Sequence, residues 1–355
     1  MERQRLKEIL DNFPKLRIAV AGDFFLDKWL EIDRSLDEPS VETNLTAYQV
    51  VAKRCYAGAA GTVLSNLAAL GTGKLFALGF VGDDGEAYEM LRLLHKTGIN
   101  TDALFKSDKV MTPTYTKPVF RRENGIEESN RLDHKNVNPT PAELEQKIID
   151  AVWEIAPRVD ALIALDQLTS EGKGVLTPRV RQELAKLGDS YPNLVLYADS
   201  RAFIKEFHNM IIKCNNIEAA KLFHDNKESD TGALLVSDTS DPTDTEKHLL
   251  SLAKHTGRPV FISCGSRGVM TISKEGRPVL VPGITLPPDT PIDIVGAGDA
   301  CSSGIVTSLC SGAAPEEAAF VGNLAAAITI QVIGTTGTAT RDEVMALYDE
   351  YYGRT

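Results

Sequence analysis

Short apolar runs alternate with helical patterns along most of this chain, and that alternation constrains its fold more than any other feature. The first run, residues 17–22, is Arg-Ile-Ala-Val-Ala-Gly, which predicts a buried strand followed by a turn. Similar runs occur at 75–81, 161–165, 194–198, 210–213 and 259–263, separated by helical patterns such as 59–70, 85–96 and 178–187. Strands joined through helices pair in parallel, with helices on both faces. The sequence therefore predicts an α/β fold with a doubly wound, mainly parallel sheet flanked by helices.

Two segments break this rhythm, about 30–55 and 111–132. Within the second, residues 115–120 and the following Asn124-Gly125 predict a strand, a hairpin turn and a second strand. Each segment follows a strand near the start of the chain, so we expect the two to form one small β-sheet. We predict that this sheet is a lid over the carboxyl edge of the larger one, within a single domain that comprises residues 1–355.

Composition excludes several classes of function. The formal charge of −11 disfavours nonspecific binding to nucleic acid or to an anionic membrane, so the expected partner is a small molecule. No stretch approaches the roughly 20 apolar residues of a membrane span, and the first 15 residues lack the apolar centre of a signal peptide. The five cysteines are scattered, without a CxxC pair. We expect a cytoplasmic protein.

A glycine-rich turn with an acid, Gly296-Ala297-Gly298-Asp299, precedes a helical stretch of small residues. Glycines let the backbone turn tightly, and the N–H groups that begin a helix bind anions. A carboxylate beside such an anion site is suited to accept a proton from an attacking hydroxyl, as phosphoryl transfer requires. A helix cap after a glycine turn has the same pattern, so the motif alone leaves both interpretations open.

A second motif, Asn215-Asn-Ile-Glu218, follows the apolar run at 210–213. An amide and a carboxylate three residues apart share one face of a starting helix, and both are oxygen ligands that hold Mg²⁺ through its waters. The same spacing also forms a helix capping box, which the spacing alone favours. Position supports the functional interpretation, because ligands of open α/β sheets bind at the carboxyl ends of strands.

With these motifs, the chain resembles the ribokinase-like (pfkB) carbohydrate kinase family over about residues 16–347. The matching segments are, in chain order, 22–27, 67–71, 81–85, Asn215 with Glu218, 263–268, 296–299 and Asn323. Within the family the chain looks most like the kinase domain of heptose-phosphate kinase/ADP-heptose synthases, through 22–27, 114–117 and 131–133. The resemblance covers the kinase half of those bifunctional proteins, so we expect the kinase activity alone.

The resemblance implies a role for each matching residue. Asp299 would be the general base, beside an anion hole formed by the backbone of Gly296, Ala297 and Gly298. The acceptor sugar would be contacted by Asp27, Gly58, Thr62 and Lys117. The nucleotide would be bordered by Ser263, Gly265, Gly268 and Asn323, while Asn215 and Glu218 would hold Mg²⁺ largely through water. The resemblance also implies ATP as the phosphoryl donor and a homodimer, and it leaves open a requirement for a monovalent cation.

Departures from the family pattern cluster on the sugar side. Thr62 stands where the family usually has asparagine, and a threonine lacks the amide donor that pairs with sugar hydroxyls. Ala57 replaces one of two glycines, Cys214 replaces a common proline, and Gln167 stands where the heptose kinases have tyrosine. The residues expected to act in phosphoryl transfer match the family pattern. The sequence therefore predicts the class of reaction better than it predicts the substrate.

We therefore predict an ATP- and Mg²⁺-dependent kinase of a sugar or sugar phosphate, with a heptose 7-phosphate-like acceptor as one candidate. A nucleoside kinase would share the phosphoryl-transfer residues, and a noncatalytic sugar- or nucleotide-sensing protein would bind without turnover. A dinucleotide-binding dehydrogenase fits poorly, because the glycine motif does not follow the first strand.

Overall fold

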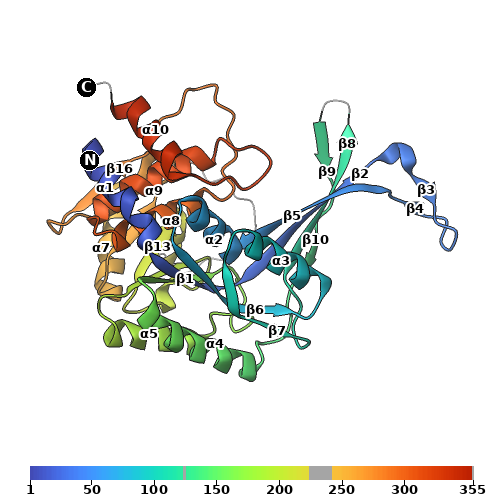
Figure 1. The fold of residues 1–355 in the computed structure, drawn as a ribbon, viewed down its shortest axis with the longest axis horizontal. Helices are drawn as coiled ribbons and strands as arrows, with labels where there is room; N and C mark the ends of the chain where they lie inside the picture. Colours follow the sequence, from blue (N-terminus) through green and yellow to red (C-terminus); the bar gives the residue numbers. More distant parts are fainter. Residues whose placement is uncertain (123–124, 224–241, 354–355) are drawn as a thin grey trace.

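A nine-stranded sheet forms the centre of the molecule in the computed structural model, which describes residues 1–122, 125–223 and 242–353 (Figure 1). Seven neighbouring strands, from β14 to β7, pair in parallel, whereas β15 pairs antiparallel with β14, and β16 pairs antiparallel with β15 at one edge. The strands are, across the sheet, β16 (Pro278–Pro282), β15 (Gly268–Ile272), β14 (Val260–Ser263), β13 (Ile211–Asn215), β12 (Val195–Ser200), β11 (Ala161–Asp166), β1 (Arg17–Gly22), β6 (Lys74–Gly82) and β7 (Asn100–Ser107). The predicted doubly wound, mainly parallel sheet is confirmed.

Helices cover both faces of this sheet, because its strands are apolar on both sides. In β1, Ile18 and Val20 face one core, and Ala19 and Ala21 face the other. The first core is covered by α1 (Arg3–Asn12), α2 (Ala60–Ala69), α3 (Gly85–Lys96), α8 (Ala297–Cys310), α9 (Pro315–Thr329) and α10 (Arg341–Tyr352). The second is covered by α4 (Ala142–Ile155), α5 (Pro178–Ser190), α6 (Asn216–Phe223) and α7 (Pro242–Thr256).

A second, small sheet projects from the body of the molecule (Figure 1). It consists of β10 (Leu132–His134), β8 (Thr114–Arg122), β2 (Phe24–Ile32) and β5 (Val50–Ala59), with β9 (Gly125–Glu128) paired to β8. The two segments predicted to fold together therefore do so. The sheet begins at Phe24, earlier than predicted, because β2 follows β1 almost directly. Asn124 of the predicted hairpin turn lies outside the described residues.

Two short strands, β3 (Glu38–Pro39) and β4 (Thr46–Ala47), form a separate pair at the far end of the small sheet. Among the described residues, no helix is long and apolar enough to span a membrane.

Candidate active site

The glycine turn before α8 is shaped by close packing. Gly296 has φ +83°, in the left-handed region, and a Cβ added there would lie 2.3 Å from Thr336 Cγ2. Both facts require glycine at this position. α8 begins at the next residue, and the N–H of Ala297 donates to the Ile294 carbonyl at 3.2 Å. The following amides, those of Gly298 and Asp299, occupy the helix positions that have no intrahelical acceptor and are suited to an anion.

Asp299 lies in the first turn of α8 and is half-buried. Burial and the negative charge of Asp199 raise its pKa to about 7, while the positive charges of Lys213 and Arg201 act in the opposite direction. A carboxyl group with a pKa near neutrality exchanges protons readily at physiological pH. Asp299 is therefore suited to general-base chemistry.

A buried ion pair, which sequence reasoning missed, lies beneath this turn. Lys213 Nζ lies 2.8 Å from Asp199 Oδ2, and the two residues are register partners on β13 and β12. The side chain of Lys213 is only 6% exposed, and its Nζ would lie 3.5 Å from a Cβ placed on Gly298. Burial acts to lower the pKa of Lys213, but the charge and hydrogen bond of Asp199, together with Tyr197 and Cys301, outweigh it, so the pKa is raised and the ammonium stays charged. The turn thus has a fixed cation beside its amides.

Asn215 and Glu218 cap α6 reciprocally. Asn215 Oδ1 accepts from the N–H of Glu218 at 2.8 Å, and Glu218 Oε2 accepts from the N–H of Asn215 at 2.8 Å. This is the capping arrangement that their spacing favoured. Burial and the charge of Asp199 raise the pKa of Glu218. Within the described ranges, no group of three or more His, Cys, Asp and Glu could hold a metal ion, so a metal here would need ligands from water or substrate.

The predicted sugar-contacting residues Asp27, Gly58 and Lys117 come together on the small sheet. A Cβ at Gly58 would lie 2.6 Å from Asp27 Oδ2, so glycine is needed for the carboxylate to lie over β5. Lys117 Nζ lies 3.9 Å from Asp27 Oδ1 and 4.8 Å from the centre of the Trp29 ring. Burial raises the pKa of Asp27, and the charges of Lys117 and Arg131 oppose that shift.

Thr62, in the first turn of α2, is buried, and its hydroxyl donates to the Ala57 carbonyl at 3.2 Å. Its Cγ2 would lie 3.9 Å from a Cβ at Gly296. The side chain therefore packs towards the glycine turn, and its hydroxyl already has a backbone partner.

The four predicted nucleotide residues lie around the antiparallel edge of the large sheet. Ser263 ends β14, and its hydroxyl donates to the Cys214 carbonyl at 3.4 Å. Gly265 and Gly268 have φ +60° and +106°, and a Cβ at Gly268 would lie 2.1 Å from the Val281 carbonyl oxygen. Asn323, on α9, donates through Nδ2 to the carbonyls of Val281 and Pro282 at 2.9 and 3.0 Å. These residues hold β15 and β16 in place beside α9.

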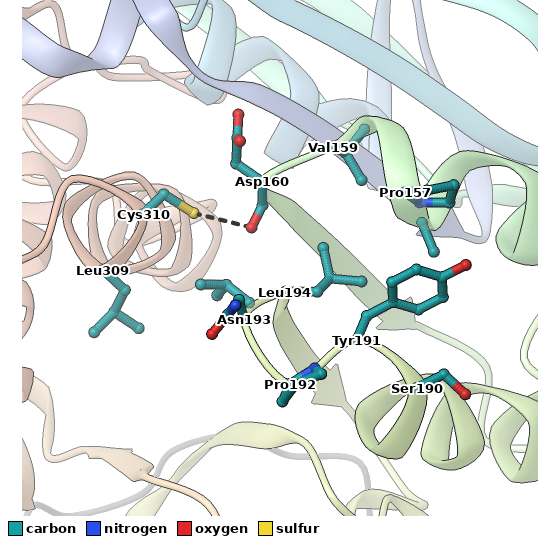
Figure 2. Close-up of a pocket in the computed structure, with 12 residues that line it drawn as sticks. Pro157, Val159, Asp160, Ser190, Tyr191, Pro192, Asn193, Leu194, Leu309 and Cys310 are labelled. Atoms are coloured by element: carbon teal, nitrogen blue, oxygen red, sulfur yellow. Dashed lines mark hydrogen bonds between the residues drawn. The ribbon is translucent and has the colours of Figure 1, made fainter.

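A cavity of about 460 Å³ lies away from this site, at the amino ends of strands in the large sheet (Figure 2). Its lining includes Asp160, Val195 and Cys310, which lie at the amino ends of β11 and β12 and the last turn of α8. Cys310 Sγ donates to the Asp160 carbonyl at 3.6 Å. Along α8, Cys310 lies about 16 Å from Asp299 at 1.5 Å per residue, so the cavity is not part of the candidate site.

Solved sugar kinases share this architecture. Phosphofructokinase-2 from Escherichia coli, solved with substrates and products, superposes with a TM-score of 0.69 at 17% identity, covering 96% of this chain and 100% of that one. Arabidopsis thaliana ribokinase, solved with ribose and ATP, superposes with a TM-score of 0.65 at 18% identity, covering 94% and 98%. The fold is therefore ribokinase-like.

Sequence comparison defines the family. The chain belongs to the pfkB family of carbohydrate kinases, which it matches over residues 26–341. It is similar to the bifunctional protein HldE of Geotalea uraniireducens, with 24% identity over 346 residues that cover 98% of this chain and 66% of the relative. The corresponding protein of Desulfatibacillum aliphaticivorans is 27% identical, covering 93% and 62%. The chain thus spans about two thirds of the length of these relatives.

Proposed function

We propose that this carbohydrate kinase transfers the γ-phosphoryl group of ATP to a hydroxyl of a sugar or sugar phosphate, in a Mg²⁺-dependent reaction with Asp299 as general base. The observation that carries the proposal is the placement of Asp299, whose pKa is about 7, at the amino end of α8 beside the buried Lys213 ammonium. The Asp299 carboxylate can then accept a proton from an attacking hydroxyl, and the Lys213 ammonium provides positive charge where that hydroxyl would meet a phosphoryl group.

The reaction follows from this placement. The Asp299 carboxylate accepts the proton of the acceptor hydroxyl, and the hydroxyl oxygen forms a new bond to the γ-phosphorus. The bond from that phosphorus to the bridging oxygen of ADP breaks, and ADP leaves with the bonding electron pair. The N–H groups of Gly298 and Asp299 and the Lys213 ammonium stabilise the negative charge on the phosphoryl oxygens.

The residues near α6 fit a water-mediated Mg²⁺ site. Glu218 uses Oε2 in the helix cap, which leaves Oε1 to hold a metal-bound water, and the raised pKa indicates a carboxylate that would gain from a nearby cation. Asn215 Oδ1 is occupied by backbone donors, so Asn215 would act mainly by fixing Glu218. A Mg²⁺ ion held there would supply positive charge that offsets the charge of the phosphates.

The acceptor side of the proposed site combines cations with two carboxylates, since Arg131 donates through Nε and Nη2 to Asp133 at 2.6 and 2.8 Å. Asp27 lies near Lys117, and Arg131 stacks over Tyr115 with its guanidinium carbon 4.2 Å from the ring centre. Asp27 is suited to bind hydroxyls, whereas Lys117 and Arg131 are suited to a phosphate at the far end of the acceptor. We therefore propose a phosphorylated acceptor, with a heptose 7-phosphate-like sugar as the first candidate.

A substrate panel tests the function. Purified protein with Mg·ATP is offered sugars, their terminal phosphates and nucleosides, and ADP formation is measured. We expect turnover with a sugar phosphate that exceeds the rate with the matching free sugar by about tenfold or more, as loss of charge-assisted contacts costs at least that much. Lys117→Met should erase most of this preference. Turnover with nucleosides alone, or binding without turnover, would refute the proposal.

We also propose a cytoplasmic homodimer. The five cysteines lie within the described residues and are all free, as in a reducing compartment. Exposed apolar side chains gather along the small sheet and its end pair, namely Val41, Leu45, Tyr48, Val50 and Val51. Light scattering should give twice the mass of the chain, and Val51→Lys should shift it towards the monomer.

A further inference from the structure

Arg201 is a cation at the carboxyl edge of the large sheet to which the mechanism above gives no role. It directly follows β12, and its N–H donates to the Asp166 carbonyl at 3.0 Å, which fixes its backbone to the end of β11. Asp199, two residues earlier, pairs with Lys213 beneath the glycine turn. Arg201 therefore emerges beside the point where the acceptor and the γ-phosphate would meet, and it is exposed.

Among the described residues, the guanidinium of Arg201 is held by Gln167. With the Gln167 amide oriented so that its oxygen faces the guanidinium, that oxygen accepts from Arg201 Nη2 at 2.6 Å and from Nε at 3.2 Å. Gln167 is itself fixed, because its backbone N–H donates to Asp23 Oδ2 at 3.0 Å. This contact uses one edge of the guanidinium and leaves the Nη1 hydrogens for an anion.

Arg201 also lies close enough to Asp299 to act on its carboxylate. The pKa of Asp299 is raised chiefly by burial and Asp199, and Arg201 opposes that shift. A guanidinium that follows β12 directly and acts on the base is suited to contact a phosphate transferred beside that base.

We infer that Arg201 is a catalytic residue whose guanidinium contacts the transferring phosphoryl group, and that Gln167 is a positioning residue that orients it. The inference rests on the proposed function. It also accounts for glutamine at 167, where the sequence departs from the heptose-kinase pattern, since an amide oxygen can accept two guanidinium bonds without neutralising the charge. If Arg201 were instead a solvated surface residue with no role in the reaction, its substitution would not affect catalysis.

The test is steady-state kinetics with Mg·ATP and the best acceptor from the substrate panel. Arg201→Gln should lower kcat by about 10²-fold or more, as removal of a donor to developing charge does, with a much smaller change in KM for ATP. Arg201→Lys should recover part of the loss. The acidic limb of the kcat/KM profile should move to higher pH in Arg201→Gln, because a charge that lowers the pKa of Asp299 is gone.

Two further variants separate catalysis from folding. Gln167→Met, which removes the acceptor but keeps the side-chain length, should lower kcat by about three- to tenfold with little effect on KM for ATP. Arg158→Gln is the matched control, because Arg158 is exposed at the amino end of β11 and pairs only with Glu154 at 3.4 Å among the described residues. It should leave kcat unchanged.

Failure of this inference is distinguishable from failure of the proposed function. If Arg201→Gln keeps kcat within about threefold and its pH profile is unmoved, while Asp299→Asn is inactive, the arginine has no catalytic role and the kinase mechanism stands. If Asp299→Asn is active as well, the proposed function itself is wrong.

Discussion

The pH dependence of turnover is the prediction that the structure makes most quantitatively. As general base, Asp299 must be ionised, and burial together with Asp199 raises its pKa to about 7. A carboxyl group with an ordinary pKa near 4 would be fully ionised throughout the neutral range, and turnover would not depend on pH there. The raised pKa instead predicts that activity is lost as the pH falls through neutrality.

The magnitude follows from the fraction of Asp299 that is ionised. With a pKa of about 7, roughly a tenth of the carboxyl groups are ionised at pH 6 and roughly nine tenths at pH 8. The value of kcat/KM should therefore rise about tenfold between these two pH values and level off above.

The assay is kcat/KM from pH 5.5 to 9 with saturating Mg·ATP, using an acceptor without a group that titrates in that range. Asp199→Asn should move the acidic limb to lower pH, because it removes a negative charge near Asp299 and leaves the Lys213 ammonium unopposed. A flat wild-type profile between pH 6 and 8, or a limb that moves to higher pH in Asp199→Asn, would refute the reasoning.

The remaining predictions concern the ion pair and the acceptor glycine. Lys213→Met should lower the free energy of unfolding by about 3 kcal/mol, since it leaves Asp199 largely buried without its partner, and chemical denaturation measures the loss. The double variant with Asp199→Leu should regain most of that stability without regaining turnover, and full activity would contradict the role given to Lys213. Gly58→Ala should raise KM for the acceptor by about tenfold or more while KM for ATP is unchanged, because the new methyl group displaces the Asp27 carboxylate. An unchanged acceptor KM would show that Asp27 does not bind the sugar.

The large sheet was predictable because the physical cause of each strand is local. Residues 17–22 and 161–165 are apolar on both faces, and this pattern is typical of a strand that helices cover on both sides. β15 and β16, at the antiparallel edge, and β7 were harder to find. β16 has proline at each end, and β15 begins at a glycine with positive φ. The two strands pair antiparallel without a helix between them, so they do not follow the strand–helix alternation that indicated the other strands.

The candidate site was only partly predictable, because much of it depends on pairing between strands. Lys213 ends an apolar run in the sequence, and nothing local indicates that its ammonium meets Asp199 on the next strand. The contact between Gln167 and Arg201 also joins two strand ends that are far apart in the chain. Asp299 was found because its glycine turn and its helix are adjacent in sequence.

Asp299→Asn tests the central claim most directly. Transfer of labelled γ-phosphate from ATP to the acceptor, measured beside ATP binding by calorimetry, should show unchanged binding and a rate about 10²-fold or more below the wild type. The variant should melt no lower than the wild type at pH 8, because it removes a carboxylate whose ionisation is opposed by its surroundings. Near-normal phosphate transfer by a folded Asp299→Asn protein would contradict the account.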